Sequence, residues 1–202
     1  MMKQCLLACL ILASAMSLQG CPVLVVGAAI GGTAMVANER RSSDTLLADE
    51  RIEWTSSQRL RESGQWEQMN PNITSYNRIA LLTGQVSSED IRQLAEKIVS
   101  EIPGVRGVSN ELVVGAFSNF GSRSSDAFVS TQVKARLVSG SGVNPGHVKV
   151  LTEAGVVYLL GLVTQNEGDA AARIAAGTQG VNKVVKYFEY IADPTGATDR
   201  KS

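Results

Sequence analysis

The pattern of apolar and polar positions repeats once along the chain, at an offset of 77 residues. Residues 148–164 contain two apolar, β-branched runs around a short turn at residues 153–155, a pattern that predicts a β-hairpin. Residues 73–86 repeat it, and their Gly-Gln-Val end at residues 84–86 aligns with Gly-Leu-Val at residues 161–163. Two copies of one module are therefore expected.

Apolar stripes at helical spacing lie before and after each hairpin. They predict helices at residues 48–61, 88–102, 126–138 and 167–176. Ser87 and a T-x-x-E capping box at Thr164 are expected to begin the second helix of each copy. Apolar runs at residues 105–114 and 181–191 predict a closing strand. The fold class is therefore α+β, with two tandem αββαβ modules, each a three-stranded mixed sheet packed by two helices.

The first 20 residues have a basic start, an apolar run and small neutral residues, as in a secretory signal peptide. Residues 18–21, Leu-Gln-Gly-Cys, resemble the cleavage box of bacterial lipoproteins. That resemblance implies that Cys21 becomes the acylated first residue of the mature chain; a cytoplasmic thiol is the alternative. By the same resemblance, Pro22 rather than Asp at the next position favours transport to the outer membrane, where the protein would face the periplasm. Because Cys5 and Cys9 leave with the signal, the mature chain would keep no thiol for a disulfide, a metal or a nucleophile.

The chain is expected to divide into six segments. These are the signal peptide (1–20), a lipid-anchored apolar spacer and linker (21–43), the first module (44–115), an interdomain linker (116–125), the second module (126–191) and a disordered tail (192–202). The apolar part of the spacer is shorter than the roughly 20 residues of a spanning helix. Its Gly27-x-x-x-Gly31 sequence leaves a helix-pairing role open beside that of a flexible spacer.

Charge separates the two modules although the whole chain is balanced, with 19 basic and 19 acidic residues. Residues 44–115 carry seven Lys/Arg against eleven Asp/Glu, whereas residues 121–191 carry seven against five. The second module is therefore better suited to an anionic partner, and nothing indicates nucleic-acid binding. His147 has no second His or Cys to share a metal, so it is interpreted as a surface residue. No cofactor, metal or catalytic residue is predicted, and an enzyme remains only as a third alternative.

Phe128 lies on the first helix of the second module, about 140° from the centre of the buried stripe formed by Val129, Val133 and Leu137. The predicted phospholipid-binding residues share this outward face or its edges: Arg123, Phe128, Thr131, Gln132, Lys134, Ala135 and Arg136. An exposed aromatic ringed by bases is typical of a membrane-interface site for anionic phospholipid, of the phosphatidylglycerol or cardiolipin type. Packing of Phe128 against the first module or the linker is the alternative. Trp54, which is surrounded by acids, is expected to pack between the modules.

The order of elements, the two Gly-x-Val hairpin ends, Gly-Leu-Val-Thr at residues 161–164 and the alanines at residues 170–172 resemble the BON-domain family. The resemblance covers residues 44–191. It implies a non-catalytic protein linked to phospholipid binding and outer-membrane integrity, in which an aromatic at the place of Phe128 begins the lipid-contacting surface. The competing hypothesis is a periplasmic adaptor that uses the same face to recruit an envelope enzyme or assembly factor.

Overall fold

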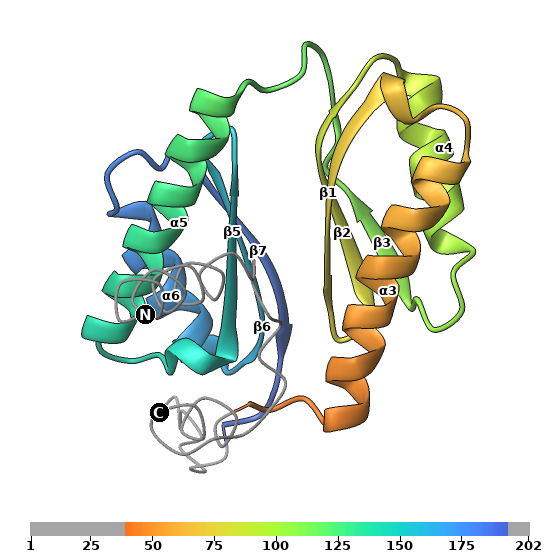
Figure 1. Ribbon diagram of the computed structural model, residues 1–202. Helices are drawn as coiled ribbons and strands as arrows, with labels where there is room; N and C mark the ends of the chain where they lie inside the picture. The colour runs from red at the N-terminus through yellow and green to blue at the C-terminus, as the bar shows by residue number, and fades with distance from the viewer. Residues whose placement is uncertain (1–38, 194–202) are drawn as a thin grey trace, which may run out of the picture. The chain divides into compact units, whose positions relative to one another are not determined.

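A computed structural model describes residues 39–193, so the predicted signal peptide, Cys21, the apolar spacer and the tail from residue 194 lie outside the described residues. The elements are α3 (Ser43–Glu62), η2 (Trp66–Gln68), β1 (Met69–Tyr76), β2 (Ile79–Val86), α4 (Glu89–Ser100), β3 (Gly107–Asn110), β4 (Val113–Val114), α5 (Phe120–Ser139), η3 (Pro145–His147), β5 (Val148–Glu153), β6 (Val156–Val163), α6 (Gln165–Ala176) and β7 (Lys183–Tyr190). The two tandem αββαβ modules are confirmed (Figure 1).

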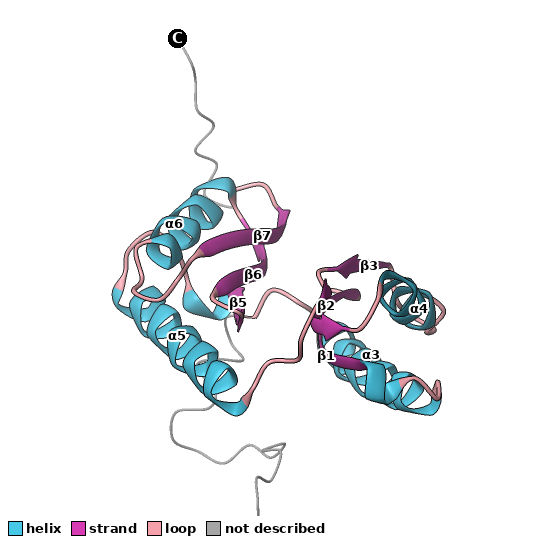
Figure 2. Cartoon of the chain, turned by 90° about the horizontal axis from the view of Figure 1, so that it is seen from above, coloured by secondary structure: helices cyan, strands magenta, loops and turns pink. Residues whose placement is uncertain are grey.

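The same mixed sheet is built twice. In the first module β2 is central, antiparallel to β1 and parallel to β3 and β4. In the second module β6 is central, antiparallel to β5 and parallel to β7. The register also repeats, because Ile73 faces Leu82 and Val150 faces Leu159, each pair displaced by 77 residues. Within each module the two helices cover one face of the sheet (Figure 2).

The closing strand of the first module is interrupted, unlike the continuous strand expected at residues 105–114. The N–H of Glu111 donates to the carbonyl of Leu82, and the side chain of Leu112 then turns into the core, where it is buried. Burying a leucine stabilises a fold by about 1.5–3 kcal/mol. The strand is therefore divided into β3 and β4 on either side of this residue.

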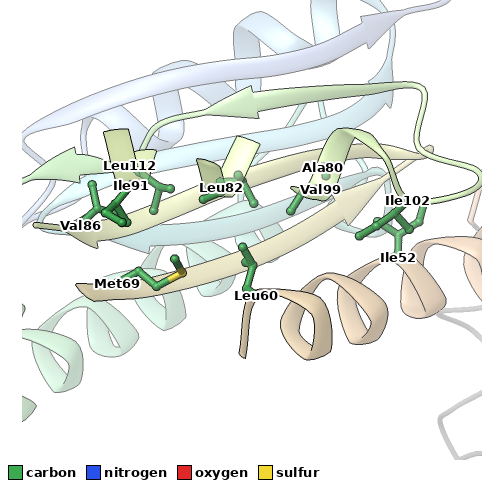
Figure 3. Close-up of a cluster of buried hydrophobic side chains, with 11 residues drawn as sticks. Ile52, Leu60, Met69, Ala80, Leu82, Val86, Ile91, Val99, Ile102 and Leu112 are labelled. Carbon is green, nitrogen blue, oxygen red and sulfur yellow. The ribbon is translucent and has the colours of Figure 1, made fainter. Parts of the chain in front are cut away.

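Each module has its own apolar core between helices and sheet. In the first module Leu60 of α3 points toward Leu82 of β2, and Ile52 of the same helix lies beside Ile102 (Figure 3). In the second module Val129, Val133 and Leu137 are buried, as their spacing predicts. The fully buried Ala171 and Ala175 of α6 are small enough to let that helix approach the sheet closely.

An aspartate on the first helix of each module holds the turn of the hairpin, and Asp49 and Asp126 are themselves 77 residues apart. The turn residues have positive φ angles from 50° to 75°, as in a type I′ turn: Asn77, Arg78, Ala154 and Gly155. Asp49 accepts their N–H groups at 2.9 and 2.7 Å in the first module. Asp126 accepts both at 2.9 Å in the second. One carboxylate thus fixes each hairpin to its helix.

The glycine of each Gly-x-Val hairpin end allows a close backbone approach. A Cβ on Gly84, whose φ is +108°, would lie 2.2 Å from the carbonyl oxygen of Asn70. A Cβ on Gly161 would lie 2.4 Å from the carbonyl oxygen of His147. Neither backbone oxygen can move aside cheaply, which explains why both repeats require glycine here.

The sheet residues that alternate with the cores form a separate apolar cluster, with Tyr76 and Leu81 from the first module and Tyr158 and Leu160 from the second. Polar contacts accompany it: Leu162 N–H donates to the Tyr76 hydroxyl, and Lys149 Nζ lies 2.8 Å from Glu53 Oε1. Burial and the nearby carboxylates of Glu111 and Glu153 raise the pKa of Tyr158 to about 12. Trp54 takes no part in this cluster and is 68% exposed, so its predicted interdomain packing is wrong.

The segment before α3 contacts both modules. Arg41 pairs with Asp49 at 2.8 Å and lies over the ring of Tyr76 in the first module. Arg40 pairs with Glu167 of α6 at 2.7 Å and donates to the carbonyl of Leu162 in the second. The segment that leads into α3 is therefore bonded to both modules, at Asp49 and at Glu167.

His147 is buried, so its interpretation as a surface residue is wrong. Its Nδ1 lies 3.0 Å from Glu167 Oε1. Burial acts to raise the pKa of Glu167, but hydrogen bonds from Arg40, the Thr164 N–H and His147 outweigh it and lower that pKa to about 2. Glu167 also completes the predicted capping box with Thr164, which is confirmed.

Several helix starts differ from the prediction. Helix α3 begins at Ser43, five residues before the expected start at residue 48, because the Ser42 hydroxyl accepts the N–H of Thr45 as a cap. Helix α5 begins at Phe120, six residues early, because Asn119 Oδ1 accepts the N–H of Ser122 as a cap. The second half of the predicted linker at residues 116–125 is therefore helical. Helix α4 is capped by Ser88, one residue after the predicted Ser87.

Candidate membrane-binding face on α5

One side of α5 is committed to the fold. Val129, Val133 and Leu137 enter the core of the second module, and Asp126 holds the hairpin turn from the same side. These residues recur at intervals of three or four, so they make one inward stripe along the helix. The orientation of the opposite side is thereby fixed.

The outward side presents apolar side chains to solvent. Phe128 is 63% exposed, so the alternative in which it packs against the first module or the linker is wrong. Thr131 and Ala135 are exposed beside it, and the Thr131 hydroxyl is satisfied by the carbonyl of Ala127. Val138, 66% exposed, continues this line at the end of the helix. Sequence reasoning missed Val138, although its spacing from Phe128, Thr131 and Ala135 is the signal that would have found it.

Basic residues flank this apolar line. Arg123 and Lys134 are exposed on one flank, eleven residues apart, and form no ion pair within residues 39–193. The acid of α5 is Asp126, which is buried and bonded to the turn. The outward side of α5 therefore carries positive charge and no exposed carboxylate of its own helix.

Two of the predicted contact residues are less available than the others. Arg136 is exposed on the opposite flank, but it donates to the carbonyl of Gly177 and lies 3.4 Å from the Thr178 hydroxyl, which holds it toward the end of α6. Gln132 is half-buried at the edge of the inward stripe. The structure thus brings Phe128, Thr131 and Ala135 together with Arg123 and Lys134. Gln132 and Arg136 lie at the margin of this face.

A hollow of about 220 Å³ lies beside α5. Its lining comes from β1, α5 and β5: Asn72, Arg123, Asp126, Ala127, Ser130, Leu151, Thr152 and Glu153. The polar groups bond mainly to protein, because Ser130 donates to Thr152, Glu153 accepts from Asn72 and Gln85, and Asp126 accepts from the turn. This hollow consequently offers no carboxylate or hydroxyl poised for catalysis.

Neither a spanning helix nor a metal cluster occurs in the described part of the chain. Between residues 39 and 193 no helix has the length and apolar character needed to cross a membrane. Over the same range no three His, Cys, Asp or Glu side chains gather in a way that could hold a metal ion. The exposed α5 face is the feature that remains to be explained.

The repeated αββαβ fold points to a known class of domain. Residues 48–116 and 125–192 match the BON domain, and the chain belongs to the BON-domain family. Among its relatives, Outer membrane lipoprotein DolP of Haemophilus influenzae is 37% identical over 185 residues, covering 90% of this chain and 94% of that protein. The 21 kDa hemolysin of Actinobacillus pleuropneumoniae is 34% identical over 152 residues, covering 75% and 78%. The Osmotically-inducible protein Y of Escherichia coli is 31% identical over 119 residues, covering 56% and 58%.

Proposed function

We propose that this protein is a non-catalytic, acyl-anchored lipoprotein of the outer membrane, facing the periplasm, whose second BON domain binds anionic phospholipid and supports membrane integrity. The similarity to Outer membrane lipoprotein DolP over nearly the whole chain supports the location. The resemblance of residues 18–21 to the cleavage box of bacterial lipoproteins supports acylation at Cys21. The Cys21→Ser variant tests that anchor. It should lose both acylation, which metabolic labelling with palmitate measures, and retention in the membrane fraction.

The observation that carries the lipid contact is the exposed Phe128 on a helix whose outward side holds bases and no acid. Moving a phenylalanine side chain out of water contributes about 1.5–3 kcal/mol when burial is complete. Each base near an anionic surface adds about 1 kcal/mol. Arg123 and Lys134, which no carboxylate neutralises within residues 39–193, are free to make that contribution.

The test is vesicle sedimentation with phosphatidylglycerol or cardiolipin vesicles and the Phe128→Glu variant. Losing the ring and adding an acid should lower binding by about a hundredfold. Far-UV circular dichroism should not change, because the side chain is exposed. Val113→Glu is the matched control, since Val113 is 62% exposed but lies in the first module. Phe128→Glu binding as strongly as the wild type would reject the site.

A protein partner at the same face is the competing function. A photocrosslinker at position 128 that captures one envelope protein, together with no vesicle binding by the wild type, would favour an adaptor. Salt weakens either contact, because both depend on charge.

A further inference from the structure

The outward side of α3, on the first module, is a second exposed surface with a different composition. Trp54 is 68% exposed and Leu47, seven residues earlier on the same line, is 60% exposed. A large exposed aromatic with a neighbouring aliphatic side chain is the composition of a protein contact. The exposed acids Asp44 and Glu50 on this helix oppose an anionic membrane.

We propose that this face binds α3 of a second copy of the chain, in antiparallel orientation. When two identical helices pack antiparallel, residues whose numbers add to a constant lie opposite each other. A constant near 111 places Trp54 of each copy opposite Ser57 of the other. Successive residues rise 1.5 Å, so the two Trp54 side chains are offset by about 4.5 Å along the helices, as in offset aromatic stacking.

A hollow of about 310 Å³ occurs at that place. It is lined by Trp54, Ser57, Gln58 and Arg61, all on the outward side of α3. In the antiparallel arrangement Trp54 of the second copy meets this hollow, and the hollow of the second copy receives the first Trp54 in return. The surface is thus self-complementary in shape, as a two-fold interface requires.

The charges on α3 are self-complementary in the same register. Glu50 and Arg61 lie on one flank of Trp54, and their numbers add to 111. Arg51 and Glu62 lie on the other flank, and theirs add to 113, a displacement of about 3 Å. In an antiparallel pair of identical helices, each flank lies against the same flank of the other copy. Each flank would therefore hold two ion pairs between copies, one in each direction. All four side chains are exposed, and neither Glu50 nor Arg51 forms an ion pair within residues 39–193. Arg61 lies over the ring of Trp66 and Glu62 accepts from Gln58, contacts within α3 and with η2 that hold both side chains at the exposed surface.

A contact made by one helix from each copy is small compared with interfaces that are stable in solution, which bury about 1,200–2,000 Å². The dimer is consequently weak, with a dissociation constant on the order of 0.1 mM. Confinement of two copies to one membrane raises their effective concentration and favours the contact. The contact does not depend on the phospholipid face of α5.

Sedimentation equilibrium of the full mature chain in neutral detergent tests the proposal. Arg61→Glu or Glu50→Arg alone sets like charges opposite each other twice, and should weaken self-association by about tenfold. The double variant Glu50→Arg/Arg61→Glu should restore it. These two residues are about 16 Å apart along their own helix, so the restoration cannot come from a pair within one chain. Trp54→Ala should remove self-association, whereas Arg59→Glu, an exposed base outside the contact line, should preserve it.

Circular dichroism of each variant shows whether the fold is retained. A wild type that remains monomeric up to about 1 mM would overturn the proposal. That is the result expected if another segment of the chain or a membrane, rather than a second copy, covered this face. A double variant as weak as the single ones would overturn the register.

Discussion

Replacing Asp126 by Asn tests whether a helix carboxylate holds the hairpin turn. Asn keeps the size of Asp, but its amide offers one acceptor where the carboxylate offers two, and it turns an N–H₂ group toward the second turn N–H. A hydrogen bond to a charged group contributes about 1.5–3 kcal/mol, and a buried N–H left without a partner costs about 1–3 kcal/mol. We expect a loss of about 3 kcal/mol in the free energy of unfolding, since the side chain is buried and both bonds are 2.9 Å long.

Urea unfolding measures this loss. With a slope of about 2 kcal/mol per molar urea, the midpoint should fall by about 1.5 M. Far-UV circular dichroism reports both modules, whereas tryptophan fluorescence reports the first module, which holds both Trp54 and Trp66. Asp49→Asn should cost about 1 kcal/mol more, because Arg41 also loses its anionic partner.

Asp90→Asn is the control, an exposed acid whose replacement should change stability by no more than about 0.5 kcal/mol. If Asp126→Asn unfolded at the same urea concentration as the wild type, the turn would be held by something other than this carboxylate.

Two further predictions concern α6 and the hairpin end. Because the pKa of Glu167 lies near 2 in the folded protein and near 4.5 when unfolded, about 3 kcal/mol of stability is present above pH 4.5 and is lost as the pH falls toward 2. Urea midpoints between pH 5 and 2.5 should therefore fall less steeply for Glu167→Gln, and equal slopes would contradict this. Gly161→Ala should cost about 2–3 kcal/mol, since the new Cβ meets a backbone oxygen. Gly107→Ala, which meets nothing within 4 Å, should by comparison change thermal stability little.

The repeated fold was predictable because the signals that specify it are local. Alternating strands, helical stripes and the capping box at Thr164 each depend on residues within one element, and the second hairpin and the capped helix after it lie where expected. The start of α5 was not predictable from periodicity, because residues 121–125 carry no apolar stripe and the helix extends there from the Asn119 cap.

Partners distant in the sequence account for the remaining errors. His147 is buried because it meets Glu167, 20 residues later, and Trp54 stays exposed because Tyr76, Tyr158 and their neighbours make the contact between modules. On α5 the outward direction of Phe128 followed from helical angles alone. Arg136 donates to the carbonyl of Gly177 in the loop after α6, a contact that helical angles along α5 do not predict.

The equivalence of Asp49 and Asp126 distinguishes the inward residues of α3 and α5, which build the modules, from their outward residues, which face possible partners. Both aspartates face inward and grip the same type of turn, so the outward residues of α3 and α5 were free to diverge after the duplication that the repeat indicates. One copy now shows tryptophan among acids and bases, and the other shows phenylalanine among bases. Grafting the outer residues of either helix onto the other should therefore move its specificity to the opposite end of the chain while the architecture persists.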